Sequence, residues 1–317
     1  MEVTIGKRNA FICNLKVFLM FFVVYGHLIE TKMDDNEVFM WQYYIIYAIH
    51  MPMFAFLSGM FLKGKNVCLL QCKKILLYYC IFQCFSMIVW YVLKQEKLSF
   101  SIPYWHLWYL LSLSCWAFLC FLLEYVEAYF YGTIWKVFLI IVCIGVACII
   151  GNVESVNRIF SLSRTIVFFP YVLMGKYFPI NIDLKKYKIA SILIGNISFA
   201  LLIYLKPMIP VQFFYHADSY QTIGVEHGTM IRFLSYLIAV GLGFFAFVWI
   251  PKKRLWISKI GTDTFWIYLF HAPMVLVLRE VVFWENEFLY IASWIAVVII
   301  LFLYKGFQWG EKLYRIV

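Results

Sequence analysis

The chain has 317 residues, of which 64% are apolar and 14% are charged, and its mean hydropathy is +0.83. A soluble domain is about half apolar and about a quarter charged, so this composition excludes an ordinary soluble fold and predicts a protein that uses lipid as solvent. The formal net charge of +10 does not indicate nucleic-acid binding, because the basic residues are scattered between hydrophobic stretches.

Apolar stretches of about 20 residues, the length that crosses a bilayer as a helix, recur along the whole sequence. We expect about ten such spans, at 11–31, 39–62, 74–93, 104–123, 134–151, 159–178, 187–205, 230–250, 262–280 and 286–304. Basic residues dominate every second connection, which predicts that both termini are cytoplasmic. The sequence thus predicts an all-α, multi-pass integral membrane protein, with residues 1–317 forming one membrane domain.

The connection at 124–136 fits this charge pattern least well. It belongs to the set of connections predicted to be cytoplasmic, yet it carries Glu124 and Glu127 against Lys136 alone.

The first span carries Lys16 and His27 on one helical face. The two residues are eleven positions apart, which corresponds to about three turns and about 16 Å along a helix axis. Ionisable groups at membrane depth are costly and mark functional sites by default. A cation near the cytoplasmic end and an imidazole deeper in the membrane suit a ligand that is anionic at one end and reactive at the other. The alternative is a snorkelling lysine and a histidine bonded to the backbone.

The second span contains His50 followed by Pro52, and then Ser58 and Gly59. Proline removes a backbone donor and favours a kink that could open a polar cavity. Small residues such as Ser58 and Gly59 let another helix approach closely. A hairpin of the first two spans could therefore bring His50 near His27.

Polar groups continue in the later spans. Trp105 and His106 lie at an outer boundary, where they form either an aromatic belt or a sugar platform. Arg164 lies early in the sixth span, and His271 lies in the ninth.

The outer connection 206–229 is long enough to be a binding loop, with Asp218 and Tyr220 as plausible contacts. His216 and His227 in the same loop are expected to be exposed. None of the nine cysteines falls in a predicted outer loop, and no histidine completes a zinc set, so we expect neither a disulfide framework nor a metal site.

Several blocks of the sequence are similar to those of a known family. They are residues 8–16 running into Val23–His27, then Tyr47–Gly59, Ser163–Tyr171 with Gly175, and Ile260–His271. In this order they resemble the integral-membrane acyltransferase family 3, especially its fucose 4-O-acetylase-like branch. The Lys-x10-His spacing matches the family's basic-x10-His signature. Cys13-Asn14 departs from the family, whose members commonly have Asp before this Asn.

The resemblance implies O-acetylation of a cell-surface carbohydrate, with acetyl-CoA as a cytoplasmic co-substrate and no other cofactor, in the bacterial cytoplasmic membrane. Membrane lipids, acetyl-CoA and the carbohydrate are the expected partners. Imidazole can serve as the base near neutral pH, so His27 and His50 are the catalytic candidates.

The candidate binding residues fall into two sets. Those for the acyl donor are Lys16, Asn14 and Arg164, and those for the acceptor are Trp105, His106, Asp218, Tyr220 and His271. Two other functions remain open: a transporter or flippase for a glycan or small solute, and a haem or quinone redox protein with histidine ligands.

Overall fold

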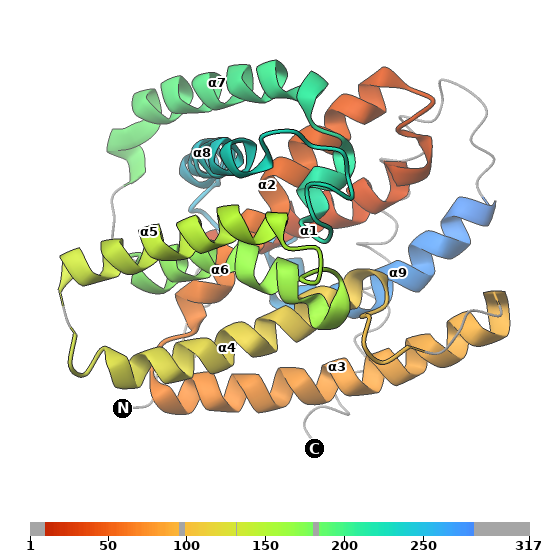
Figure 1. Ribbon diagram of the computed structural model, residues 1–317, viewed down its shortest axis with the longest axis horizontal. Helices are drawn as coiled ribbons and strands as arrows, with labels where there is room; N and C mark the ends of the chain where they lie inside the picture. Colours follow the sequence, from red (N-terminus) through yellow and green to blue (C-terminus); the bar gives the residue numbers. More distant parts are fainter. Residues whose placement is uncertain (1–9, 95–98, 131, 180–183, 282–317) are drawn as a thin grey trace. The chain divides into compact units, whose positions relative to one another are not determined.

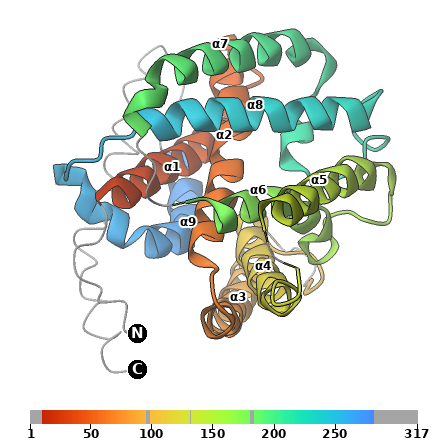
Figure 2. The same ribbon diagram turned by 90° about the vertical axis from the view of Figure 1, so that its left-hand side faces the viewer.

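The computed structural model describes residues 10–94, 99–130, 132–179 and 184–281, and within these ranges every regular element is a helix (Figures 1 and 2). The α-helices are α1 (Ala10–Ile29), α2 (Glu37–Phe61), α3 (Lys65–Lys94), α4 (Trp108–Val126), α5 (Thr133–Ile149), α6 (Leu162–Tyr177), α7 (Lys188–Leu205), α8 (Gly228–Trp249) and α9 (Thr264–Val281). Short 3₁₀ turns join several of them.

Seven of these helices, namely α1 to α5, α7 and α8, are long and apolar enough to cross a membrane. The predicted all-α, multi-pass class is therefore confirmed. The sixth and ninth predicted spans correspond to α6 and α9, which are not among these seven helices, and the tenth, at 286–304, lies outside the described residues.

The boundaries agree with the predicted spans to within a few residues, except at α3. This helix begins at Lys65 rather than at the predicted position 74. Its first turns include Lys73 and Lys74, both exposed. A lysine can continue a helix beyond the apolar stretch because its long stem allows the ammonium to reach water.

The chain divides into two compact units. The first comprises residues 1–50 and 249–317, and the second comprises residues 51–248. The single membrane domain over 1–317 stays a prediction.

In the first unit, α1 packs against α9 and against the 3₁₀ turn η8 (Trp256–Thr262). Asn14 is buried at this contact, and its amide donates to the carbonyl oxygens of Pro251 (2.8 Å) and Lys253 (3.0 Å). The Ser258 hydroxyl donates to the Asn14 side-chain oxygen at 2.5 Å. The backbone at Gly261 approaches Cys13 so closely that a Cβ would collide with it. Asn14 thus fastens the 251–258 segment to α1.

The helices of the second unit pack largely in pairs, with α3 beside α4, α5 beside α6 and α7 beside α8 (Figures 1 and 2). The C-terminal part of α2 meets α6 at Gly59 and Gly175. A Cβ on Gly59 would collide with the Val172 carbonyl, and one on Gly175 would collide with the Phe56 carbonyl. The expectation that Gly59 permits close helix approach is confirmed.

An ion cluster joins the C-terminal ends of α4 and α6. The Lys176 ammonium bonds to Glu124 and lies 3.6 Å from Glu127, and the Tyr177 hydroxyl also donates to Glu127. The Lys176 side chain is only 4% exposed. The acidic 124–136 connection, which fitted the charge pattern poorly, is therefore neutralised by a lysine from another helix.

The connection 206–229 folds inward instead of lying over the surface. It contains the 3₁₀ turn η7 (Val211–Tyr215), and Val211, Phe213 and Phe214 are buried. The prediction that His216 is exposed is wrong, because its ring packs edge-on against Phe168 and Phe213 in this apolar cluster. His227 is exposed, as predicted.

Candidate active site

The predicted base His27 belongs to a polar cluster of the first unit. It lies in the last turn of α1, and its Nδ1 is 3.7 Å from the Glu30 carboxylate. Arg279 from α9 binds the same carboxylate at 2.7 Å and also donates to the His27 carbonyl oxygen. The His27 and Glu30 side chains are 13% and 27% exposed, so the pair is shielded but not sealed.

His271 completes this cluster. Its ring stacks on that of His27, with centroids 5.4 Å apart and planes inclined by 25°. Its Nδ1 lies 2.6 Å from the Tyr268 carbonyl oxygen. Because a carbonyl can only accept, Nδ1 carries the hydrogen and Nε2 is the basic nitrogen. The structure thus joins His27 to His271, although His271 was expected as an acceptor-binding residue.

His50 is buried in the part of α2 that belongs to the first unit. Its Nδ1 is 2.6 Å from the Ile46 carbonyl, one turn earlier, and its ring meets Tyr47 edge-on. The helix α2 continues through Pro52. His50 therefore has a fixed ring and tautomer, which suits an orienting group.

The two other predicted residues of the first unit differ in their surroundings. Lys16 is half-buried on α1, which is a continuous helix from Ala10 to Ile29, so the expected three-turn spacing from His27 is present. Asn14 uses both polar atoms of its side chain to hold the 251–258 segment. This arrangement indicates a structural role for Asn14 and leaves little capacity for binding an acyl donor.

The remaining predicted site residues belong to the second unit. Arg164 donates to the Tyr215 carbonyl at 3.0 Å, and its guanidinium lies 4.8 Å from the Trp108 ring centroid. It therefore lies beside the 206–229 connection, and its role in binding the acyl donor stays a prediction. Asp218 in that connection pairs with Arg158 at 2.7 Å, and this bond raises the pKa of Arg158.

Aromatic residues of the same set are largely buried. The Tyr220 hydroxyl donates to the Cys148 carbonyl at 2.8 Å, and burial raises the pKa of Tyr220 to about 12. His106 is buried in the 3₁₀ turn η2 (Trp105–Leu107), which precedes α4. Trp105 itself is half-buried. Tyr220 and His106 are therefore buried side chains and not exposed surface groups.

Left-handed backbone is concentrated around these second-unit residues. Among the described residues other than glycine, positive φ occurs at Trp105 (32°), Phe160 (47°), Ser161 (55°), His216 (51°) and His227 (53°). His216 and His227 lie in the 206–229 connection, whereas Trp105, Phe160 and Ser161 lie in the 3₁₀ turns that precede α4 and α6. Such conformations are unfavourable for ordinary side chains and tend to cluster at functional sites.

Reasoning from the sequence missed Glu30 and Arg279. The i,i+3 spacing of His27 and Glu30 was a usable signal, because such residues share a helical face. Arg279 gave no local signal, since it is 249 positions from the carboxylate that it binds. Within the described ranges, no group of three or more His, Cys, Asp and Glu side chains is placed to hold a metal ion.

The first-unit cluster can perform general base chemistry. A neutral imidazole accepts the proton of a hydroxyl as its oxygen attacks an acyl carbonyl. A carboxylate on the other ring nitrogen orients the imidazole and stabilises the imidazolium that forms. Glu30 faces Nδ1 of His27 and is itself held by Arg279. The 3.7 Å separation is compatible with a bond that tightens when substrate binds.

Comparison with known proteins supports this chemistry at the level of the family. No curated protein and no solved structure matches the chain. A family model described as an acyltransferase domain matches residues 9–304, which is nearly the whole chain. With its multi-pass helical fold, the protein therefore belongs to acyltransferase family 3 and is a membrane acyltransferase.

Proposed function

We propose that this acyltransferase moves an acetyl group from acetyl-CoA to a hydroxyl of a cell-surface carbohydrate. The observation that carries the proposal is the His27–Glu30 pair, braced by Arg279, in a chain of this family. The resemblance to the fucose 4-O-acetylase-like branch supports a sugar hydroxyl as the acceptor. In this proposal acetyl-CoA is a co-substrate, and no metal or other cofactor takes part.

His27 is the proposed base. Its imidazole takes the proton of the sugar hydroxyl while the hydroxyl oxygen attacks the thioester carbonyl. The imidazolium then gives this proton to the CoA sulfur as the carbon–sulfur bond breaks, so that CoA leaves as the thiol. Glu30 stabilises the imidazolium, and Arg279 keeps the carboxylate in place. His271 and His50 are proposed as positioning residues. Lys16 is proposed to attract the anionic donor along α1, by a charge-assisted contact with phosphate.

The proposed setting is a bacterial cytoplasmic membrane with both termini in the cytoplasm. The alternation of basic and acidic connections supports this orientation. The donor then approaches from inside, while the 206–229 connection and the residues around it face the acceptor outside.

The proposal is tested in the host cell. The gene is deleted and restored as wild type or as His27→Ala, and ester-linked acetate on purified surface polysaccharide is measured by proton NMR. Acetate should disappear on deletion and return only with wild type, and the shifted ring proton identifies the acetylated hydroxyl. Unchanged acetate together with a loss of polymer export would instead favour the transporter.

A further inference from the structure

Arg232 is a fully buried cation in the second unit. It lies in α8, four residues after the helix begins at Gly228 and thus about 6 Å along its axis. Within the described part of the chain, none of its three guanidinium nitrogens has a hydrogen-bond partner. Its contacts are aromatic: the guanidinium carbon is 5.1 Å from the Phe213 centroid and 4.9 Å from the Tyr220 centroid.

These ring contacts do not satisfy the charge. An arginine side chain stays protonated in proteins, so it cannot avoid the cost of burial by losing its charge. Cation–π contacts offset only part of the free-energy cost of burying an unpaired charge. A nearby anion would offset this charge.

The surroundings of Arg232 are positive. Burial and the charges of Arg232 and Arg164 together hold the pKa of His216 well below its usual range. The Asp218 carboxylate of the same connection is already bound by Arg158. The charge pattern therefore favours an anion supplied by a ligand.

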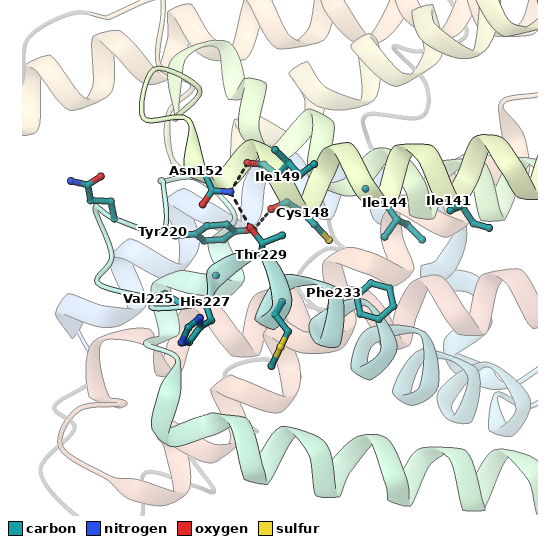
Figure 3. A pocket seen from close by; sticks show the side chains of 14 residues that line it. Ile141, Ile144, Cys148, Ile149, Asn152, Tyr220, Val225, His227, Thr229 and Phe233 are labelled. Atoms are coloured by element: carbon teal, nitrogen blue, oxygen red, sulfur yellow. Dashed lines mark hydrogen bonds between the residues drawn. The ribbon is translucent and has the colours of Figure 1, made fainter.

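A groove of about 940 Å³ lies between α5 and α8 (Figure 3). At one end Ile141, Ile144 and Phe233 line it, and Gly145 leaves open space there. At the other end it is polar, with Thr229, His227 and Asn152, whose amide donates to the Thr229 hydroxyl at 2.9 Å. A hydrocarbon chain fits the first end, and a polar headgroup fits the second.

Tyr220 connects the groove with Arg232. Its ring lines the groove, and it is also one of the two rings that contact the guanidinium. The ring fits there because Gly151 and Gly228 have no Cβ, which would collide with it. Gly228 also begins α8, so the positive end of the helix dipole lies at the polar end of the groove.

We propose that this groove binds a lipid phosphate, with the chain between α5 and α8 and the phosphate at the N-terminus of α8, attracted by the charge of Arg232 behind the Tyr220 ring. The identity of the lipid rests on the proposed function: in that case the lipid is the carrier of the sugar acceptor. The site belongs to the second unit, whereas the cluster around His27 belongs to the first.

The test measures binding, so its result does not depend on acetyl transfer. Purified full-length protein in detergent is titrated with farnesyl phosphate, farnesol and inorganic phosphate, and binding is followed by native mass spectrometry. Wild type is compared with Arg232→Gln, with Arg232→Lys, which keeps the charge, and with Gly145→Trp, which fills the groove. Farnesyl phosphate should bind at least tenfold more tightly than either farnesol or inorganic phosphate.

Arg232→Gln should bind farnesyl phosphate no better than farnesol, while Arg232→Lys should retain part of the preference. Gly145→Trp should weaken binding of farnesyl phosphate while leaving the protein folded. Equal binding of farnesol and farnesyl phosphate by wild type would overturn the role of Arg232. Inorganic phosphate binding as tightly as farnesyl phosphate, unaffected by Gly145→Trp, would overturn the lipid as the source of the anion. If wild type binds farnesyl phosphate as predicted but transfers no acetyl group, the proposed function is refuted and the lipid site is not.

Discussion

At the scale of single residues, the central feature is a carboxylate between a histidine and an arginine. Glu30 lies one helical turn beyond His27 and accepts from Arg279 at 2.7 Å. This arrangement places the carboxylate on the Nδ1 side of the imidazole. Two predictions belong to this scale.

Glu30→Gln should lower kcat by about 100-fold or more, because the amide cannot stabilise an imidazolium as a carboxylate does. The fold should persist, since the amide oxygen can still accept from Arg279. The rate of acetyl transfer by purified protein measures the effect, with Glu37→Gln, an exposed carboxylate at the start of α2, as the matched control. Equal rates for the two variants would rule out the role of Glu30.

His216 should make stability depend on pH. Its pKa is held well below the usual value by burial and by the charges of Arg232 and Arg164, so the folded protein keeps it neutral. The unfolded chain takes up the proton near pH 6.5, so stability should fall below that pH by up to about 1.4 kcal/mol per unit.

The measurement is the thermal unfolding midpoint in detergent at pH 7.5 and 5.5. His216→Asn removes the titrating ring and tolerates the left-handed backbone, so its midpoint should fall less between the two pH values than that of wild type. An equal fall in both proteins would show that His216 does not titrate as described.

At the scale of helices, two of the contacts within the second unit can be tested separately: the close approach of α2 and α6 at Gly59 and Gly175, and the ion cluster around Lys176. The helix contact depends on glycine having no side chain, and the ion cluster depends on a buried lysine with two carboxylate partners.

Gly59→Ala should destabilise the protein by about 1–3 kcal/mol, because the new Cβ meets the backbone of Val172, which cannot move aside as a flexible side chain would. Gly145→Ala is the matched control, since nothing lies within 4 Å of its Cβ position. That control should be neutral or stabilising by up to about 1 kcal/mol through helix propensity. Denaturant unfolding of both variants checks the prediction, and a similar loss in both would contradict it.

Lys176→Met should cost about 3–5 kcal/mol, because it leaves two carboxylates without their cation in a shielded site. Adding Glu124→Gln removes one of these charges and should restore part of the loss. A double-mutant cycle on the unfolding free energy measures the coupling between Lys176 and Glu124. Strict additivity of the two changes would show that the pair contributes nothing.

The sequence predicted helices better than contacts. Span length and hydropathy located α1 to α9 to within a few residues, apart from the start of α3, because a bilayer demands long apolar helices. The pairs Glu30–Arg279 and Glu124–Lys176 depend on tertiary packing between distant segments, which no local pattern encodes. His216 was misjudged for the same reason: its polarity indicated a surface, but the connection around it folds inward.

At the scale of the whole molecule, family membership covers residues 9–304 and sets the chemistry as acyl transfer. The two compact units divide the candidate residues between them. The first unit holds His27, Glu30, Arg279 and His271, and the second holds Arg164, Arg232, Asp218 and Tyr220. We therefore expect substitutions in the first set to act mainly on kcat, and those in the second to act mainly on recognition of the acceptor.

The most direct test of the account is acetyl transfer by the purified protein in lipid nanodiscs. Radiolabelled acetyl-CoA is supplied with surface polysaccharide isolated from the deletion strain, and labelled polymer is counted for wild type and His27→Ala. We predict that wild type transfers acetyl groups and that the rate of transfer by His27→Ala is about 10²–10⁴-fold lower, the range typical for loss of a general base. Transfer by His27→Ala at the wild-type rate would contradict the assignment of His27 and the mechanism built on it.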